Sequence, residues 1–124
     1  MALELQKIGK SYIHGGRRLA VLDSVSLVVH PGELVVLQGS SGSGKTTLLL
    51  IAGVMIPPDQ GIARFDEVDV YDLSAGERAA LRAEKIGFVF QQFHLVPYLT
   101  VYQNVLTATL AGPVRSAHSR ARDL

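Results

Sequence analysis

Hydrophobic and polar positions divide the first part of the chain into short apolar segments that end at turns. Residues 2–12 alternate loosely between apolar and polar side chains, which predicts a strand with one buried face. Residues 21–29 are rich in valine and leucine and stop at a Pro-Gly pair, which predicts a second strand. Residues 34–37 are an unbroken apolar run between turn signals, a pattern typical of a strand covered on both faces in a parallel sheet.

Helix and strand signals follow one another in the middle of the chain. Residues 45–56 begin after a glycine-serine segment and end before two prolines, and their apolar run predicts a helix buried nearly all round. Residues 62–71 predict a short hairpin that turns near Asp66 and Glu67. Residues 86–90 are apolar again and predict another strand.

Two capping boxes predict where two further helices begin. In a capping box, two side chains three residues apart each accept a hydrogen bond from the other residue's backbone N–H. Ser74 and Glu77 have this spacing and open a helix that runs to about residue 84. Thr100 and Gln103 repeat it and open a helix that residues 112–113, Gly-Pro, should close. Together these elements predict an α/β fold.

Composition narrows the classes of function. The chain has 124 residues, enough for one domain, and its net charge of +1 gives no electrostatic reason to expect nucleic acid as a partner. Cysteine is absent from the sequence, which excludes disulfides and thiol catalysis. The start does not resemble a secretory signal, and no apolar run reaches the roughly 20 residues of a membrane-spanning helix. We therefore expect a soluble chain.

One segment carries recognisable chemistry. Residues 39–46, Gly-Ser-Ser-Gly-Ser-Gly-Lys-Thr, fit the phosphate-loop pattern Gly-x-x-x-x-Gly-Lys-Ser/Thr at every fixed position. The glycines let backbone N–H groups approach phosphate oxygens, and the helix that follows adds unpaired N–H groups and the positive end of its dipole. A flexible linker is the alternative, but predicted core elements flank the segment closely. The predicted phosphate-binding residues are Gly39, Ser40, Ser41, Gly42, Ser43, Gly44, Lys45, Thr46 and Thr47.

Wider stretches of the chain resemble the ATP-binding subunits of ABC transporters. The phosphate loop is preceded by Val-Val-His-Pro-Gly-Glu and followed by Thr-Leu-Leu, as in the family. Residues 86–100, Ile-Gly-Phe-Val-Phe-Gln-Gln-Phe-His-Leu-Val-Pro-Tyr-Leu-Thr, look like the family's Q-loop, in wording closest to its lipoprotein-releasing and macrolide-export subfamily. The resemblance covers residues 3–105. It implies a partial phosphate-loop NTPase core with an N-terminal antiparallel β-subdomain and the beginning of the helical subdomain.

The phosphate-loop pattern itself places Lys45 at the β- and γ-phosphates and the Thr46 hydroxyl at Mg²⁺. The resemblance implies ATP with Mg²⁺ and adds roles for Tyr12 and Gln91. Tyr12 matches the aromatic residue of the family's A-loop, which stacks on adenine; an ordinary tyrosine at a strand end is the alternative. Gln91 matches the Q-loop glutamine, which reaches Mg²⁺ and the attacking water, although Gln92 lies only one residue away. Lys45 and Gln91 are thus the expected catalytic residues, and Thr46 and Gln91 the expected metal ligands.

Partners and location follow from the same resemblance. Phe93, Leu95 and Tyr98 lie in the segment that, in the family, faces a membrane-spanning subunit, and exposed apolar side chains suit such a partner. We expect a second ATPase subunit in the complete protein. The expected location is cytoplasmic, peripheral at the inner face of the cell membrane, and the expected process is transport, in the direction of export.

Hydrolysis in the family needs three further motifs after the Q-loop: a Leu-Ser-Gly-Gly-Gln signature, a Walker B strand ending in Asp-Glu, and a switch histidine. None follows in this sequence. Residues 73–77 echo the signature but precede the Q-loop and are explained by the capping box. Residues 62–67 end in Asp-Glu, but Arg64 would be costly inside a buried strand. His94 lies in the wrong place for the switch base, and a packing or solvated role explains it better.

We therefore expect residues 1–124 to be the N-terminal part of a single nucleotide-binding domain that binds Mg-ATP without hydrolysing it. A stand-alone nucleotide-binding module without ATPase activity is one alternative, and it would require a genuine stop after Leu124 and a stable monomer. A phosphate-loop kinase is another alternative, but it would need a substrate lid with basic residues. The resemblance of residues 86–100 to the Q-loop argues against a kinase.

Overall fold

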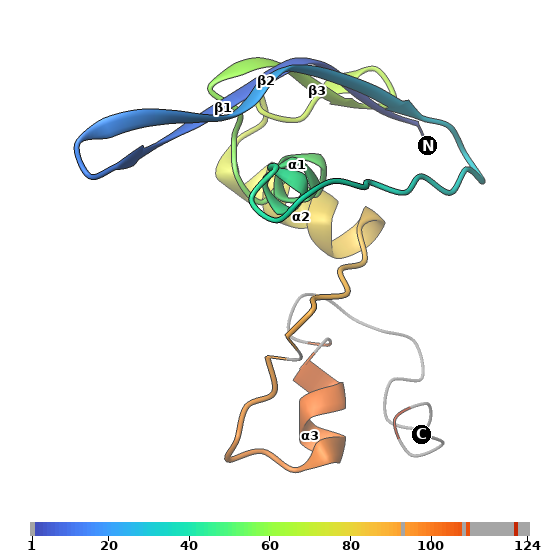
Figure 1. Ribbon diagram of the computed structural model, residues 1–124. Coiled ribbons are helices and arrows are strands. Elements are labelled where there is room, and N and C mark those ends of the chain that lie inside the picture. Colours follow the sequence, from blue (N-terminus) through green and yellow to red (C-terminus); the bar gives the residue numbers. More distant parts are fainter. Residues whose placement is uncertain (1, 93, 108, 110–120, 122–124) are drawn as a thin grey trace. The chain divides into compact units, whose positions relative to one another are not determined.

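An antiparallel sheet dominates the first part of the computed structural model, which describes residues 2–92, 94–107, 109 and 121 (Figure 1). The chain divides into two units, Met1–Ala79 and Ala80–Leu124. The sheet belongs to the first unit and has four strands in the order β2-β1-β3-β4. The strands are β1 (Leu3–His14), β2 (Arg17–Val29), β3 (Gln60–Phe65) and β4 (Val68–Asp69).

The predicted hairpin near Asp66 and Glu67 is confirmed, and the two strands predicted at the start of the chain pair as a further hairpin. β1 pairs with β2 from Leu3↔Val29 to His14↔Arg17, and the two residues between the strands are glycines with φ of 57° and 75°. Positive φ at both positions is the requirement of a tight hairpin turn, and glycine meets it without strain. β3 pairs with β4 through Phe65↔Val68, so this hairpin turns at Asp66 and Glu67 as predicted.

The helix α1 (Lys45–Ala52) packs against the sheet, and the core forms between them (Figure 1). The largest fully buried side chains of the described residues come from β1, from α1 and from the residues that follow α1 and β4. They are Leu5, Ile8, Ile51, Val54 and Val70.

The predicted helix over residues 45–56 is too long, and its predicted burial on all sides is wrong. α1 ends at Ala52, Gly53 caps it, and Val54 takes a left-handed φ of 59°. Leu49 is 58% exposed because α1 covers one face of one sheet and has only that face to bury. Of the apolar residues between α1 and Pro57, Val54 is buried in the core, whereas Met55 is exposed.

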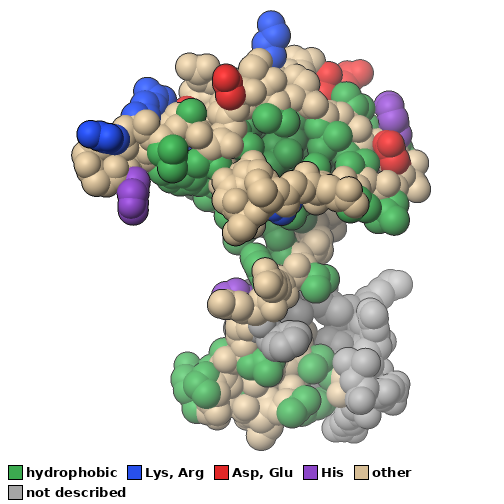
Figure 2. All heavy atoms as spheres, in the orientation of Figure 1, with side chains coloured by type: hydrophobic (Ala, Val, Ile, Leu, Met, Phe, Trp, Pro, Cys, Tyr) green, Lys and Arg blue, Asp and Glu red, His purple; other side chains and the backbone are tan. Residues whose placement is uncertain are grey.

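Residues 34–37 and 86–90 are not strands, contrary to prediction. Leu34 and Val36 are 89% and 67% exposed, while Val35 and Leu37 line an apolar cavity of about 170 Å³ beside α1. Residues 34–37 are thus extended with one face covered. Apolar side chains of the first unit remain exposed to solvent (Figure 2). A strand needs a hydrogen-bonded neighbour, and the described residues bring none alongside either segment.

Two short helices open with the predicted capping boxes. α2 (Ala75–Lys85) crosses the boundary between the units, and at its start Ser74 N donates to Glu77 Oε2 (2.8 Å) while Glu77 N donates to Ser74 Oγ (3.3 Å). α3 (Val101–Leu106) has the same reciprocal pair between Thr100 and Gln103. Residues 112–113, the predicted end of the last helix, lie outside the described residues. None of the described helices is long and apolar enough to cross a membrane.

Candidate functional site

The phosphate-loop segment joins the extended residues 34–38 to the first turn of α1. Gly42 and Gly44 both take left-handed φ values, 78° and 88°, and Gly44 is buried. A Cβ at Gly44 would lie 2.7 Å from the carbonyl oxygen of Val21 and 2.8 Å from Cδ2 of Leu22. Both the backbone conformation and the close approach to β2 therefore require glycine at this position.

The side chain of Lys45 folds back into the loop. Its Nζ donates to the carbonyl oxygens of Gly39 (2.9 Å) and Ser40 (2.7 Å), and it lies 3.4 Å from Ser43 Oγ. Ser43 N also donates to Ser40 O (3.3 Å). The loop thus closes around an ammonium group, which is the charge that a phosphate would meet there.

The start of α1 offers unpaired donors at the same place. Gly44 is the N-cap and makes no side-chain cap, and the first helical hydrogen bond runs from Leu48 N to Gly44 O (2.8 Å). The first turn of a helix has N–H groups with no partner inside the helix, and its dipole favours an anion. This end of α1 can therefore accept phosphate oxygens.

Tyr12 and the phosphate loop line one cavity. The cavity measures about 240 Å³, and Val21 of β2 contributes to its wall. Its remaining lining residues are consecutive: Gly42, Ser43, Gly44, Lys45, Thr46 and Thr47. Tyr12 is 42% exposed, so its ring is open to a ligand. The structure thus brings the predicted adenine-stacking residue to the predicted phosphate site; the role of each residue stays a prediction.

Residues of the predicted Q-loop belong to the second unit and are described with that unit alone. Gln91 and Gln92 are exposed, and Leu95 and Tyr98 are 67% and 86% exposed. Phe93 lies outside the described residues. The ring of His94 packs edge-on against Phe90, with centroids 5.2 Å apart, in keeping with a packing role.

Asn104 organises the end of this segment. Its Oδ1 accepts from Val96 N (2.8 Å), and its Nδ2 donates to the carbonyl oxygens of Val96 and Leu99 at 3.2 and 3.1 Å. One amide side chain on α3 thereby fixes the loop that carries Tyr98.

The two segments that echo missing motifs have the predicted structural explanations. Residues 73–77 contain the capping box of α2, and residues 66–67 form the β3–β4 turn. Within the described residues, no three histidine, aspartate or glutamate side chains gather as a metal site.

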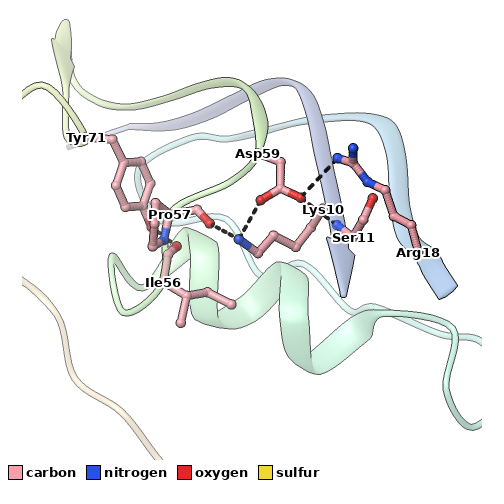
Figure 3. A network of polar contacts seen from close by, with 7 residues as sticks. All are labelled: Lys10, Ser11, Arg18, Ile56, Pro57, Asp59 and Tyr71. Carbon is pink, nitrogen blue, oxygen red and sulfur yellow. Dashed lines mark hydrogen bonds and ion pairs between the residues drawn. The ribbon is translucent and has the colours of Figure 1, made fainter. Parts of the chain in front are cut away.

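A polar cluster around Asp59 was not predicted from the sequence (Figure 3). Asp59 accepts hydrogen bonds from Lys10 Nζ through Oδ1 and from Ser11 N through Oδ2, both at 2.8 Å, and its Oδ2 lies 3.7 Å from Arg18. The hydrogen bond from Lys10, followed by that from the Ser11 backbone, holds the pKa of Asp59 below its ordinary value.

Comparison with known proteins gives consistent matches. A family model described as ABC transporter matches residues 22–124. A macrolide export ATP-binding/permease protein from Syntrophobacter fumaroxidans is 51% identical over 122 residues, which are 97% of this chain and 17% of that protein. A lipoprotein-releasing system ATP-binding protein from Rhodopirellula baltica is 44% identical over 98% of this chain and 54% of that protein. The chain thus spans about half the length, or less, of these relatives.

Solved structures give the same picture. A dimeric ATP-binding cassette in a post-hydrolysis state, bound to ADP and Pi, matches with a TM-score of 0.87 and 36% identity over 98% of this chain and 54% of that one. A second dimeric structure of a bacterial ABC transporter cassette matches with a TM-score of 0.86. These matches confirm the predicted α/β class, a partial phosphate-loop NTPase fold with an N-terminal antiparallel β-subdomain.

Proposed function

This chain belongs to the ABC transporter family, and from that premise we propose that it binds ATP with Mg²⁺ in the cavity between Tyr12 and the phosphate loop. The observation that carries the proposal is that one cavity is lined both by an exposed aromatic ring and by residues 42–47. An adenine nucleotide needs both features, because its base offers a flat face for stacking and its phosphates need N–H donors and positive charge.

The phosphates lie against the backbone of the loop and the first turn of α1. Gly44 supports this because its missing Cβ lets the loop pack directly on Val21 and Leu22 of β2. The unpaired N–H groups at the start of α1 are then available to the phosphates as donors.

Lys45 contributes the only full positive charge among the residues that line this cavity. In the free chain its ammonium is held by the carbonyls of Gly39 and Ser40. When nucleotide binds, phosphate oxygens replace these carbonyls as its partners, and hydrogen bonds between charged groups are the stronger ones.

Mg²⁺ prefers oxygen ligands and keeps several waters, so Thr46 Oγ1 and phosphate oxygens fit it. When bound, the ion neutralises charge on the β- and γ-phosphates. Gln91 would add its amide oxygen, as the family resemblance implies. Thr46 lines the cavity described above, and Gln91 is exposed within the second unit.

For the whole protein we propose ATP hydrolysis coupled to export through a membrane-spanning subunit, with a second ATPase subunit as partner. The named functions of the relatives, macrolide export and lipoprotein release, support this. The exposed Leu95 and Tyr98, with Phe93, are the proposed contact with the membrane subunit at the cytoplasmic side. The sequence of this chain contains no signature, Walker B or switch-histidine motif after the Q-loop, so we propose that it binds Mg-ATP without turnover.

Calorimetric titration with Mg-ATP tests the proposal. Lys45→Ala should lower the affinity about 10- to 100-fold, because a hydrogen bond to a charged group contributes roughly 1.5–3 kcal/mol. Lys7→Ala is the matched control, since Lys7 is an exposed lysine of β1 that does not line the cavity. Equal affinities for wild type and Lys45→Ala would show that the loop is not the nucleotide site.

A further inference from the structure

Asp59 connects β1 to the segment that follows α1 (Figure 3). Its oxygens accept from Lys10 Nζ and from Ser11 N, each at 2.8 Å, and its own N–H donates to Gly9 O at 2.8 Å. Lys10 Nζ also donates to the carbonyl oxygen of Pro57 at 2.8 Å. Asp59 and Lys10 therefore tie residues 9–11 of β1 to the segment that follows α1.

These contacts lie where β3 stops pairing with β1. The pairing of β1 with β3 ends at Gly9↔Gln60, and the pairing with β2 shifts register between Ile8 and Lys10 and again between Lys10 and Ser11. Beyond Gly9, β1 thus has a ladder on one side only. The carboxylate of Asp59 takes the place of a strand on the other side, since it accepts the outward N–H of Ser11.

The residue directly after this tie is Tyr12. The ammonium of Lys10 lies 5.9 Å from the centroid of the Tyr12 ring, within the range of a cation–π interaction. Lys10 is held firmly there, because its side chain is only 14% exposed and its Nζ has two partners on residues 57–59. The ammonium thus lies over the Tyr12 ring, which is still 42% exposed and can meet a ligand.

The chain before Asp59 is tethered as well. The hydroxyl of Tyr71 donates to the carbonyl oxygens of Ile51 (2.9 Å) and Ile56. The end of α1 and the approach to Pro57 are therefore fixed to the segment after β4. The segment that carries Asp59 is therefore fixed at both α1 and the residues after β4, and Asp59 in turn fixes β1 through its hydrogen bonds.

We propose that Asp59 and Lys10 are positioning residues for nucleotide binding, which hold the Tyr12 ring in the orientation in which the adenine base stacks on it. This inference rests on the proposed function. Neither residue lines the cavity shared by Tyr12 and the phosphate loop, so their effect passes through Tyr12. They should therefore affect the binding of the base and leave the binding of the phosphates unchanged.

The test compares two ligands, Mg-ATP and magnesium tripolyphosphate, which has the phosphates but no base. Asp59→Asn should weaken Mg-ATP binding about 3- to 10-fold, part of the contribution of one base–aromatic stack. Its affinity for tripolyphosphate should stay within about twofold of wild type. Lys10→Met, which keeps the apolar stem and removes the ammonium, should behave in the same way.

Arg64→Gln is the matched control. Arg64 forms an ion pair with Glu4 (3.4 Å) in the same sheet, and the exposure of this pair, 32% and 34%, is close to that of Asp59. Loss of this pair should leave both affinities unchanged. Tyr12→Leu provides the second control, because Asp59→Asn should have no further effect in that background.

The outcomes separate this inference from the proposed function. If Asp59→Asn binds Mg-ATP as tightly as Arg64→Gln does, or if it weakens both ligands equally, the positioning role is refuted. An equal effect of Asp59→Asn with and without Tyr12→Leu would refute it too. If Lys45→Ala leaves both ligands bound as in wild type, the nucleotide site itself is wrong, whatever Asp59 does.

Discussion

Substituting Gly44 by alanine tests whether the phosphate loop is built on a close approach to β2. The change adds one methyl group to a buried residue with φ of 88°. Gly42 is the matched control because its φ is 78°, yet a Cβ there meets nothing within 4 Å. The two variants thus share the backbone strain, and only Gly44→Ala adds a steric clash.

The magnitude follows from these two effects. A left-handed conformation costs an L-residue roughly 1–2 kcal/mol, which both variants should lose. The Cβ of Gly44→Ala would lie 2.7 Å from Val21 O and 2.8 Å from Leu22 Cδ2, and one of these contacts is backbone. Overpacking of this kind typically costs about 1–3 kcal/mol more. We therefore expect Gly44→Ala to lose about 2–5 kcal/mol of the free energy of unfolding, a large part of the roughly 5–15 kcal/mol of a typical domain.

Urea unfolding followed by far-ultraviolet circular dichroism measures the difference. The unfolding midpoint of Gly44→Ala should lie below that of Gly42→Ala by about 0.3–3 M, given an extra cost of about 1–3 kcal/mol and a denaturant slope of about 1–3 kcal/mol per M. Mg-ATP titration of both variants then asks whether the loop must sit against β2 to bind. Equal midpoints for the two alanine variants would refute the reasoning, because the contacts with Val21 and Leu22 would then carry no free energy.

Two further predictions concern Asp59 and Thr100. The pKa of Asp59 is lowered in the folded state by Lys10 and the Ser11 N–H, so its contribution to stability is present above the ordinary carboxyl pKa near 4 and is lost as the pH falls through the folded pKa. Acid titration of the free energy of unfolding should therefore be steeper for wild type than for Asp59→Asn below about pH 4, and parallel curves would contradict this. Thr100→Ala should remove the capping box of α3 and destabilise it by about 1 kcal/mol, seen as faster amide exchange at Gln103; unchanged exchange would contradict the assignment.

Features with short-range causes could be predicted from the sequence. The capping partners of α2 and α3 are three residues apart, so Ser74 with Glu77 and Thr100 with Gln103 are visible in the sequence alone. The turn at Asp66 and Glu67 is local in the same way. The phosphate loop also depends on neighbouring residues, since the conformations of its glycines and the fold of Lys45 onto Ser40 lie within one segment.

Features that depend on distant segments could not be predicted. An apolar run such as residues 34–37 shows that burial is favourable, but it does not show whether a neighbouring strand lies on each side. Leu34 and Val36 are exposed while Val35 and Leu37 are half-buried, which shows that one face of the segment is open to solvent. Asp59 lies 49 positions from Lys10 and 48 positions from Ser11 in the sequence. No pattern along the sequence relates an aspartate after two prolines to these two residues.

The sheet explains how the two ends of the candidate site are kept at a fixed distance. The phosphate loop is seated on β2, because Gly44 packs on Val21 and Leu22. Tyr12 belongs to β1 and pairs with Leu19, two residues before Val21 on β2. The hydrogen bonds between β1 and β2 therefore set the separation between the Tyr12 ring and the phosphate loop, and Asp59 secures β1 on its other side. We therefore expect the affinity for a nucleotide to depend on residues of the hairpin that do not line the cavity.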